Sequence, residues 1–241
     1  MEYCGITDIG LVREKNQDAF ITIANQYGDV LALVADGIGG ARAGEVASSE
    51  CIKYFDTVFK DSGPFDELES ATNFLSHHIS IINQKIYDLS KSYEEYSGMG
   101  TTLTGVLITS HGTLSINIGD SRVYGFLEGK SFALTKDHSL INQMLDAGEI
   151  TAEEAINHPK RHYLTKAMGI FDSISADIHK VKDMDYYLCC SDGLHGYCDI
   201  EEIRDIIFAD GKSLNDKCVD LKDLALMKGG FDNITAVLVK K

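Results

Sequence analysis

The chain has 241 residues, of which 44% are hydrophobic, and its 22 basic and 37 acidic residues give a formal net charge of −15. Nucleic acids and anionic membranes are bound through basic surfaces, so this charge argues against both as main partners. The apolar content suffices for a substantial core. With only 2 prolines and no linker-like tract, the sequence predicts one domain over residues 1–241.

The predicted elements come in the order strands, helices, strands, helices. Short apolar runs predict strands, and apolar residues three or four apart predict helices. The first part is predicted to hold strands at 3–9, 19–24 and 30–35, then helices at 43–60 and 65–90. An antiparallel meander follows at 103–110, 112–119, 121–127 and 131–134. The remainder is predicted as a polar helix at 138–155, strands at 176–181 and 186–190, helices at 200–209 and 213–227, and a strand at 234–240. Without regular strand–helix alternation, this order favours an α+β fold with antiparallel sheets.

The chain shows no targeting or membrane signal. Its N-terminus opens into strand-like sequence, and its apolar runs fall far short of the roughly 20 residues that span a bilayer. We therefore expect a cytoplasmic protein. The cysteines lack CxxC spacing and are expected to be buried free thiols in a reducing compartment, namely Cys4, Cys51, Cys189, Cys190, Cys198 and Cys218.

Three acidic residues stand beside strand-like runs that are far apart in the chain. Asp36 and Asp192 each follow such a run, and Asp232 precedes one. Clustered carboxylates repel one another and shift each other's pKa, so such a cluster normally persists because a cation neutralises it. Ligands that are all oxygen suit Mg²⁺ or Mn²⁺ rather than Zn²⁺. The pattern indicates a hydrolase that uses hard metal ions.

Several of these motifs have simpler interpretations. The sequence DGIGG at 36–40 looks like a phosphate-binding loop, but it lacks the P-loop lysine and the GxGxxG spacing. Asp120 is a fourth carboxylate between two predicted strands, and it is equally suited to pair with Arg122 and close a turn. Arg13 lies in a loop with Asp18 nearby. A loop arginine is usually a surface residue, although a guanidinium matches two phosphate oxygens.

Taken together, the motifs resemble the metal-dependent Ser/Thr protein phosphatases of type 2C, most closely the compact bacterial members. The resemblance runs nearly end to end through segments that include VADGIGG, NIGDSRVY, CSDGL and GGFDNITAVLV. Its eight segments are 7–20, 34–48, 98–105, 117–124, 134–145, 157–169, 190–194 and 229–239. Each motif is weak alone, but eight in the family's order make a specific match. The resemblance implies a β-sandwich of two antiparallel sheets flanked by helices, with a metal centre at one end.

The resemblance also implies a set of metal ligands. Asp36 would bridge two metal ions, and the carbonyl of Gly37 would bind the second. Asp192 and Asp232 would complete the ligands of the first. Asp120, together with Asp192, would hold the third ion found in bacterial relatives. The implied cofactor is therefore Mn²⁺ or Mg²⁺, with two ions in the core and a third beside them.

Other residues receive supporting roles from the same resemblance. Arg13 would grip the substrate phosphate, and Asp18 would hydrogen-bond a water on the metal. Thr101 and Thr102 would support the site. Residues from about 138 to 163 correspond to the family's mobile flap, which tunes substrate access.

The implied reaction is hydrolysis of phosphoserine and phosphothreonine in proteins by a water that bridges two metal ions. Two ions about 3.5–4 Å apart acidify such a water and neutralise charge on the transferring group, so no covalent nucleophile is needed. The expected partners are phosphorylated proteins, including a bacterial Ser/Thr kinase that the enzyme opposes, and the chain is expected to be a monomer. Two alternatives stay open. One is a pseudophosphatase that only binds phosphoproteins, against which the complete metal set argues. The other is a hydrolase of small phosphorylated metabolites.

One departure from the family concerns proton donation. Many relatives carry a histidine beside the DGxGG loop, as a candidate general acid, where this chain has Ile38 and Ala41. His138, His158 and His162 are substitutes by residue type alone, and each is more often a structural or flap residue.

Overall fold

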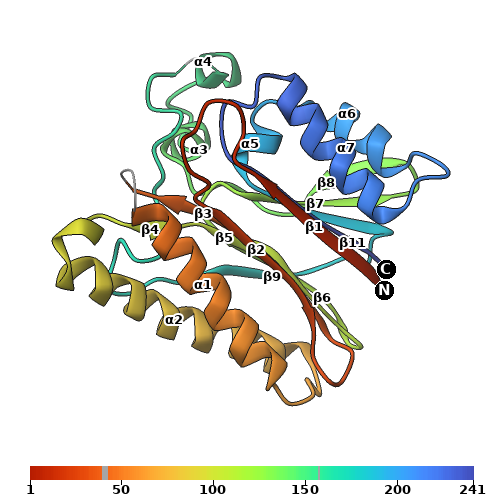
Figure 1. Ribbon diagram of the computed structural model, residues 1–241, viewed down its shortest axis with the longest axis horizontal. Coiled ribbons are helices and arrows are strands. Elements are labelled where there is room, and N and C mark those ends of the chain that lie inside the picture. The colour runs from red at the N-terminus through yellow and green to blue at the C-terminus, as the bar shows by residue number, and fades with distance from the viewer. Residues whose placement is uncertain (40–42, 157) are drawn as a thin grey trace.

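The computed structural model describes residues 1–39, 43–156 and 158–241. Two antiparallel β-sheets pack face to face, and helices cover both outer faces (Figure 1). The first sheet has the order β1 (Glu2–Asp8), β11 (Ile234–Lys240), β10 (Tyr186–Cys190), β7 (Arg122–Leu127) and β8 (Lys130–Ala133). The second has the order β2 (Asp18–Ala24), β3 (Val30–Ile38), β5 (Leu103–Thr109), β6 (Gly112–Ile118) and β9 (Asp177–Val181), with β4 (Gly100–Thr101) paired to β3. The predicted α+β sandwich is confirmed.

Helices cover each sheet separately. The second sheet lies under α1 (Ala43–Lys60) and α2 (Leu68–Ser92), and a 3₁₀ turn, η1 (Glu94–Tyr96), follows α2. The first sheet lies under α5 (Asp192–His195), α6 (Ile200–Ile207) and α7 (Leu214–Met227). Two short helices, α3 (Leu140–Asp146) and α4 (Ala152–Ile156), lie at one end of the sandwich (Figure 1). Throughout the described ranges, no helix combines the length and apolar character needed to cross a membrane.

Strand β3 shows how the sequence produces these layers. Leu31 and Leu33 belong to the core under α1 and α2, whereas Val30, Ala32 and Val34 belong to the core between the sheets. Successive residues of a strand point to opposite faces. Both faces of β3 are covered, so its sequence is a continuous apolar run rather than an alternating one.

The flap region differs from its prediction. The single helix predicted at 138–155 is two short helices, because Gly148 adopts φ 69° shortly after α3 ends. A left-handed glycine at this position is a common way for a helix to end. The side chain of Ser139 caps the start of α3 by accepting a hydrogen bond from the Asn142 amide.

The prediction that every cysteine is free was wrong for one pair. Cys4 of β1 and Cys218 of α7 form a disulfide that joins positions 214 residues apart. No spacing pattern reveals a pair brought together only by the fold. The other four cysteines are free and buried. Burial raises the pKa of the Cys189 thiol to about 12, which disfavours the nucleophilic thiolate form.

Candidate active site

Two predicted site residues meet through the pairing of β10 with β11. These strands are antiparallel neighbours, so the end of β10 lies beside the start of β11. Asp192 follows β10 and Asp232 precedes β11, which brings the two carboxylates to one edge. A Cβ at Gly193 would lie 1.9 Å from the carbonyl oxygen of Asn233. Only glycine permits this close approach of the first turn of α5 to the β11 segment.

The second sheet contributes another pair. Asp18 and Asp36 stand directly opposite each other in the register of β2 and β3. Thr102 Oγ1 accepts a hydrogen bond of 2.9 Å from the Asp36 amide, and the Thr102 amide donates one of 2.9 Å to the Asp36 carbonyl. Ser191 Oγ donates to Asp18 Oδ2 at 2.7 Å. Because Ser191 belongs to the first sheet's side of the site, this bond ties the two sheets together.

Gly37 is held in place by a hydrogen bond from its amide and by close packing against α1. Its amide donates to the carbonyl oxygen of Gln17 at 3.1 Å. A Cβ at Gly37 would lie 2.2 Å from the carbonyl oxygen of Gly44 in the first turn of α1. Any larger residue would push α1 away from the end of β3.

A cavity of about 730 Å³ opens where these segments meet. Six of the seven predicted site residues line it, namely Arg13, Asp36, Gly37, Asp120, Asp192 and Asp232. The seventh, Asp18, faces Asp36 on the neighbouring strand without belonging to the lining. Other lining residues were not predicted from the sequence, including Gln17, Lys166, Phe171 and Tyr197. Lys166 lies in a segment that carried the family resemblance, whereas Tyr197 has no signal in the sequence.

The carboxylates shift one another's protonation. Burial raises the pKa of Asp36 well above its ordinary value, and Asp18 and Asp192 raise it further. Burial, followed by Asp120 and Asp232, raises the pKa of Asp192 to about 8. Burial is also the largest cause that raises the pKa of Asp18 and of Asp120 to about 6. Burial and the neighbouring carboxylates thus both disfavour the charged forms of these side chains.

The donor set fits a hard divalent cation. Its side chains are carboxylates, the ligands that Mg²⁺ and Mn²⁺ prefer. Asp18 Oδ1 is buried without a hydrogen-bond partner in the described part of the chain. Among residues 1–39, 43–156 and 158–241, no three carboxylate, imidazole or thiolate groups converge closely enough to enclose one ion as they stand.

Arg13 stands at the mouth of the cavity and is half exposed. Its Nη2 lies 2.6 Å from Asp232 Oδ2, with side-chain exposures of 50% and 21%. The residue expected to hold phosphate is thus paired with a residue expected to bind metal.

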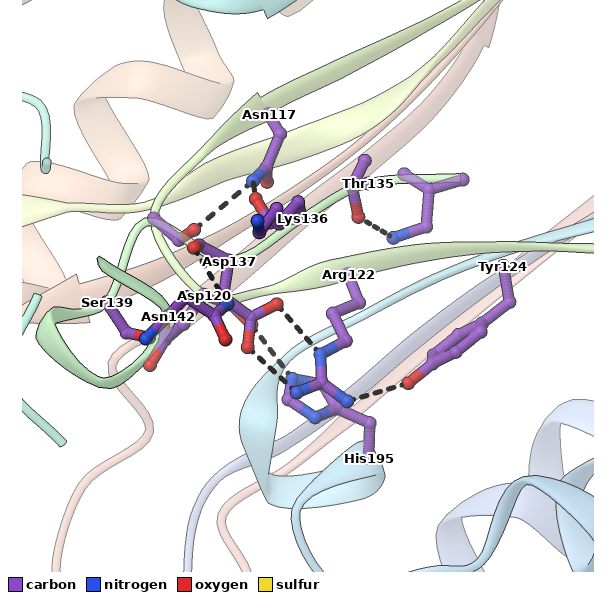
Figure 2. Close-up of polar contacts among 12 residues, drawn as sticks. Asn117, Asp120, Arg122, Tyr124, Thr135, Lys136, Asp137, Ser139, Asn142 and His195 are labelled. Carbon is purple, nitrogen blue, oxygen red and sulfur yellow. Dashed lines mark hydrogen bonds and ion pairs between the residues drawn. The ribbon is translucent and has the colours of Figure 1, made fainter. Parts of the chain in front are cut away.

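The sequence left open whether Asp120 pairs with Arg122, and Figure 2 shows the polar contacts around both residues. Arg122 donates two hydrogen bonds of 2.8 Å to Asp137 and a third, of 3.0 Å, to the Tyr124 hydroxyl. Arg122 therefore pairs with Asp137, while Asp120 lines the cavity of the acidic residues. A second cavity, of about 550 Å³, is lined by Arg122, Tyr124, Asp137 and His195.

His195 connects two of the predicted metal ligands. It lies three residues after Asp192 in α5, and its Nε2 donates to the carbonyl oxygen of Asp120 at 3.0 Å (Figure 2). Burial, followed by the charge of Arg122, lowers the pKa of His195 to about 4. The neutral ring thus fixes the Asp120 turn against the helix that begins at Asp192.

The candidate replacements for the missing histidine differ in position. His138 Nδ1 accepts a hydrogen bond from the Gly119 amide at 3.0 Å, and its Nε2 lies 3.1 Å from Asp177, so both nitrogens are engaged. His158 is absent from the cavity lining, whereas His162 belongs to it. Ile38 also lines the cavity. Ala41 lies outside the described residues.

Comparisons with known proteins agree with this geometry. The sequence model of the family described as "Protein phosphatase 2C" matches residues 12–221. "Protein phosphatase PhpP" of Streptococcus pneumoniae is 39% identical over 99% of this chain and 97% of its own. The structure of serine/threonine phosphatase Stp1 from Staphylococcus aureus has a TM-score of 0.93 at 35% identity, covering 100% of this chain and 94% of that one. The S. agalactiae serine/threonine phosphatase has a TM-score of 0.92 at 35% identity, with coverages of 100% and 99%. The resemblance drawn from the sequence motifs is confirmed.

Proposed function

This chain belongs to the protein phosphatase 2C family and is a protein serine/threonine phosphatase, and we propose that its reaction takes place in the cavity between Arg13 and the acidic residues. The observation that carries this proposal is the arrangement of Asp36, Asp120, Asp192 and Asp232 around one cavity, with raised pKa values for three of them. A phosphoryl group is itself anionic. Such a site binds it only when cations offset the carboxylates.

We assign the cations to these carboxylates. Asp36, the Gly37 carbonyl, Asp192 and Asp232 would hold two ions, and Asp120 with Asp192 would hold a third. The all-oxygen donors favour Mn²⁺ or Mg²⁺. When bound, such ions supply Lewis-acid stabilisation of the phosphoryl oxygens and activation of water.

The side chains around the cations have their own tasks. Arg13 offers a planar fork of donors to two phosphate oxygens at the mouth of the cavity. Asp18 is oriented by Ser191 through one oxygen, and its unpartnered Oδ1 is available to accept a hydrogen bond from the attacking water. Thr102 and His195 hold the backbones of Asp36 and Asp120 in place.

The flap and the biological setting complete the proposal. Residues 138–163 form a flap within a single catalytic domain, and its end brings His162 and Tyr163 to the cavity lining. We propose that the chain dephosphorylates proteins that a Ser/Thr kinase has phosphorylated, and that it acts as a monomer in the cytoplasm. The named relatives, which are protein phosphatases of bacteria, support this setting.

Release of phosphate from a panel of phosphopeptides and phosphorylated metabolites tests the proposal. We expect hydrolysis of phosphoserine and phosphothreonine peptides that EDTA abolishes and Mn²⁺ or Mg²⁺ restores. Asp192→Ala is the matched inactive variant. Turnover of metabolites alone would replace the protein substrate with a small one. Binding of phosphopeptides without turnover at any metal concentration would indicate a pseudophosphatase.

A further inference from the structure

Three exposed apolar side chains come from three separate segments, and each lines the cavity or lies within two residues of a lining residue in the sequence. Leu11, Tyr197 and Phe231 are 69%, 39% and 50% exposed, respectively. We term them the apolar rim. The loop that follows β1 carries Leu11, α5 precedes Tyr197, and Phe231 lies just before β11. The loop and α5 lie at the same end of the molecule in Figure 1.

The three residues of the apolar rim are connected by ring packing and by contacts with the backbone at Gly229 and Gly230. The rings of Tyr197 and Phe231 pack with their centroids 5.4 Å apart and their planes tilted by 40°. A Cβ at Gly229 would lie 2.2 Å from the Phe231 ring. The Leu11 amide donates to the carbonyl oxygen of Gly230 at 2.7 Å, and a Cβ at Gly230 would lie 2.9 Å from Leu11 Cγ. Both glycines have positive φ, 123° and 51°. The Gly-Gly pair therefore lets Leu11 and Phe231 lie close against the same backbone.

The apolar rim is continuous with the catalytic cavity. Tyr197 lines the cavity together with Asp192 and Asp232. Phe231 directly precedes Asp232, and Leu11 lies two residues before Arg13. A peptide whose phosphoryl group is gripped by Arg13 can pass over Tyr197 as it leaves the cavity. The residue next to the phosphorylated one lies only about 3.8 Å along the chain, so it is the substrate residue closest to the cavity border.

We propose that the apolar rim binds an apolar side chain adjacent to the phosphorylated residue of a protein substrate, and so selects phosphorylation sites with a large apolar neighbour. This inference rests on the proposed function. An apolar substrate side chain that packs on the rim would remove its exposed aromatic and aliphatic surface from water, and this burial favours binding. An acidic neighbour would bury no apolar surface against the rim, and it would approach a chain with a net charge of −15.

The test compares phosphothreonine peptides of one sequence whose flanking residues are both Gly, both Phe or both Asp. We expect kcat/KM to be about tenfold higher for the Phe-flanked peptide than for the Gly-flanked one, and lowest for the Asp-flanked one. In Phe231→Ala the ratio of Phe- to Gly-flanked kcat/KM should fall to within about twofold of unity, whereas Phe231→Leu should retain most of it. Thermal unfolding checks that both variants fold.

A matched control exists on the opposite layer. Tyr93 is 52% exposed, and its ring packs on Tyr96 with centroids 5.6 Å apart, which gives a second exposed aromatic pair. Tyr93→Ala should leave the ratio at its wild-type value. A wild-type enzyme without preference, or Phe231→Ala with an unchanged ratio, would overturn the proposal.

Two other outcomes are distinguishable. If Phe231→Ala changes the sedimentation coefficient from dimer to monomer while peptide preference persists, the apolar rim contacts a second copy of the chain and the proposal is wrong. If no peptide is hydrolysed while p-nitrophenyl phosphate is, the proposed protein substrate fails and the rim inference fails with it. Hydrolysis of all peptides at equal rates rejects the rim alone.

Discussion

Arg13 Nη2 and Asp232 Oδ2 lie 2.6 Å apart, so the side chain expected to grip phosphate holds a side chain expected to bind metal. A cation drawn to Asp232 competes with the guanidinium for the same oxygen. Displacing Arg13 frees its donors for two phosphate oxygens. Under the proposed assignment, cation binding and phosphate binding would therefore be coupled through this pair.

The first prediction concerns Arg13→Ala. It should raise KM for phosphorylated substrates, because Arg13 contacts ground-state and transition-state phosphate alike. It should also tighten Mn²⁺ binding measured by calorimetry, by at most about fivefold, because exposed ion pairs contribute little. Lys15→Ala removes another half-exposed cation, 4.0 Å from Glu45, and serves as control. Unchanged KM and kcat in Arg13→Ala would make Arg13 a surface residue, and weaker Mn²⁺ binding would contradict the coupling.

Asp192→Ala should abolish turnover on every substrate, and the metal-free variant should unfold at a temperature no lower than the wild type. Burial beside Asp120 and Asp232 raises the pKa of Asp192 to about 8, so its loss removes a buried polar group below that pH and relieves charge repulsion above it. Phosphate release with Mn²⁺ and thermal unfolding in EDTA measure the two effects. Asp183→Ala, which removes an exposed partner of Lys241, should remain active. A folded Asp192→Ala variant with near-normal activity would reject the metal assignment.

Asp120→Ala should lower kcat while two ions remain bound, because Asp120 is assigned to the third ion only. Calorimetry with Mn²⁺ should show one site fewer. His195→Ala should give a weaker version of this effect, since His195 fixes only the Asp120 backbone through its carbonyl. Loss of all ions in Asp120→Ala would show that Asp120 belongs to the central pair.

The metal-free protein should lose stability as pH rises from 6.5 to 8. The pKa of Asp192 is about 8 in the folded chain against an ordinary 3.8, so the folded state retains a proton that the unfolded state has released. Where the folded state binds more protons, raising the pH favours unfolding. Asp36 acts in the same direction. The pKa of His195 is lowered to about 4, so this residue makes the folded state more stable as pH rises, but mainly below its ordinary pKa of 6.5.

Thermal unfolding in EDTA across this pH window measures the slope. Asp192→Asn should flatten it, because the amide imitates the protonated acid. Added Mn²⁺ should oppose it, because the ion binds the deprotonated carboxylates. A metal-free wild type that becomes more stable from pH 6.5 to 8 would contradict the buried acidic cluster.

The last prediction concerns proton delivery. Ile38 lines the cavity at a position where relatives carry a candidate general acid. A serine or threonine alkoxide needs a proton as it leaves, whereas p-nitrophenolate does not, and general acids typically contribute ~10²–10⁴-fold. Ile38→His should therefore gain on phosphothreonine peptides and change little on p-nitrophenyl phosphate. Ile38→Asn controls for polarity. Equal gains on both substrates, or none, would mean that water or a flap residue such as His162 already delivers the proton.

The sequence by itself predicted the layers of the fold and the acidic residues that line the cavity. The continuous apolar run of β3 requires cover on both faces, and Asp36 ends up at the cavity because it follows that run directly. Asp192 and Asp232 were predictable for the same reason, since each is adjacent to a buried strand. Such inferences work because they depend on neighbours in the chain, whose spacing fixes where a side chain stands.

Only the tertiary structure decided which of these side chains bond to one another. Arg13 pairs with Asp232 across 219 positions, and Cys4 bonds Cys218 across 214. Arg122 donates two hydrogen bonds to Asp137, 15 positions away in the sequence, rather than pairing with Asp120, two positions away. The apolar rim likewise gathers side chains from three distant segments. Long-range contacts leave no periodic signal in a single sequence, because the geometry that selects each partner exists only after the sheets have packed.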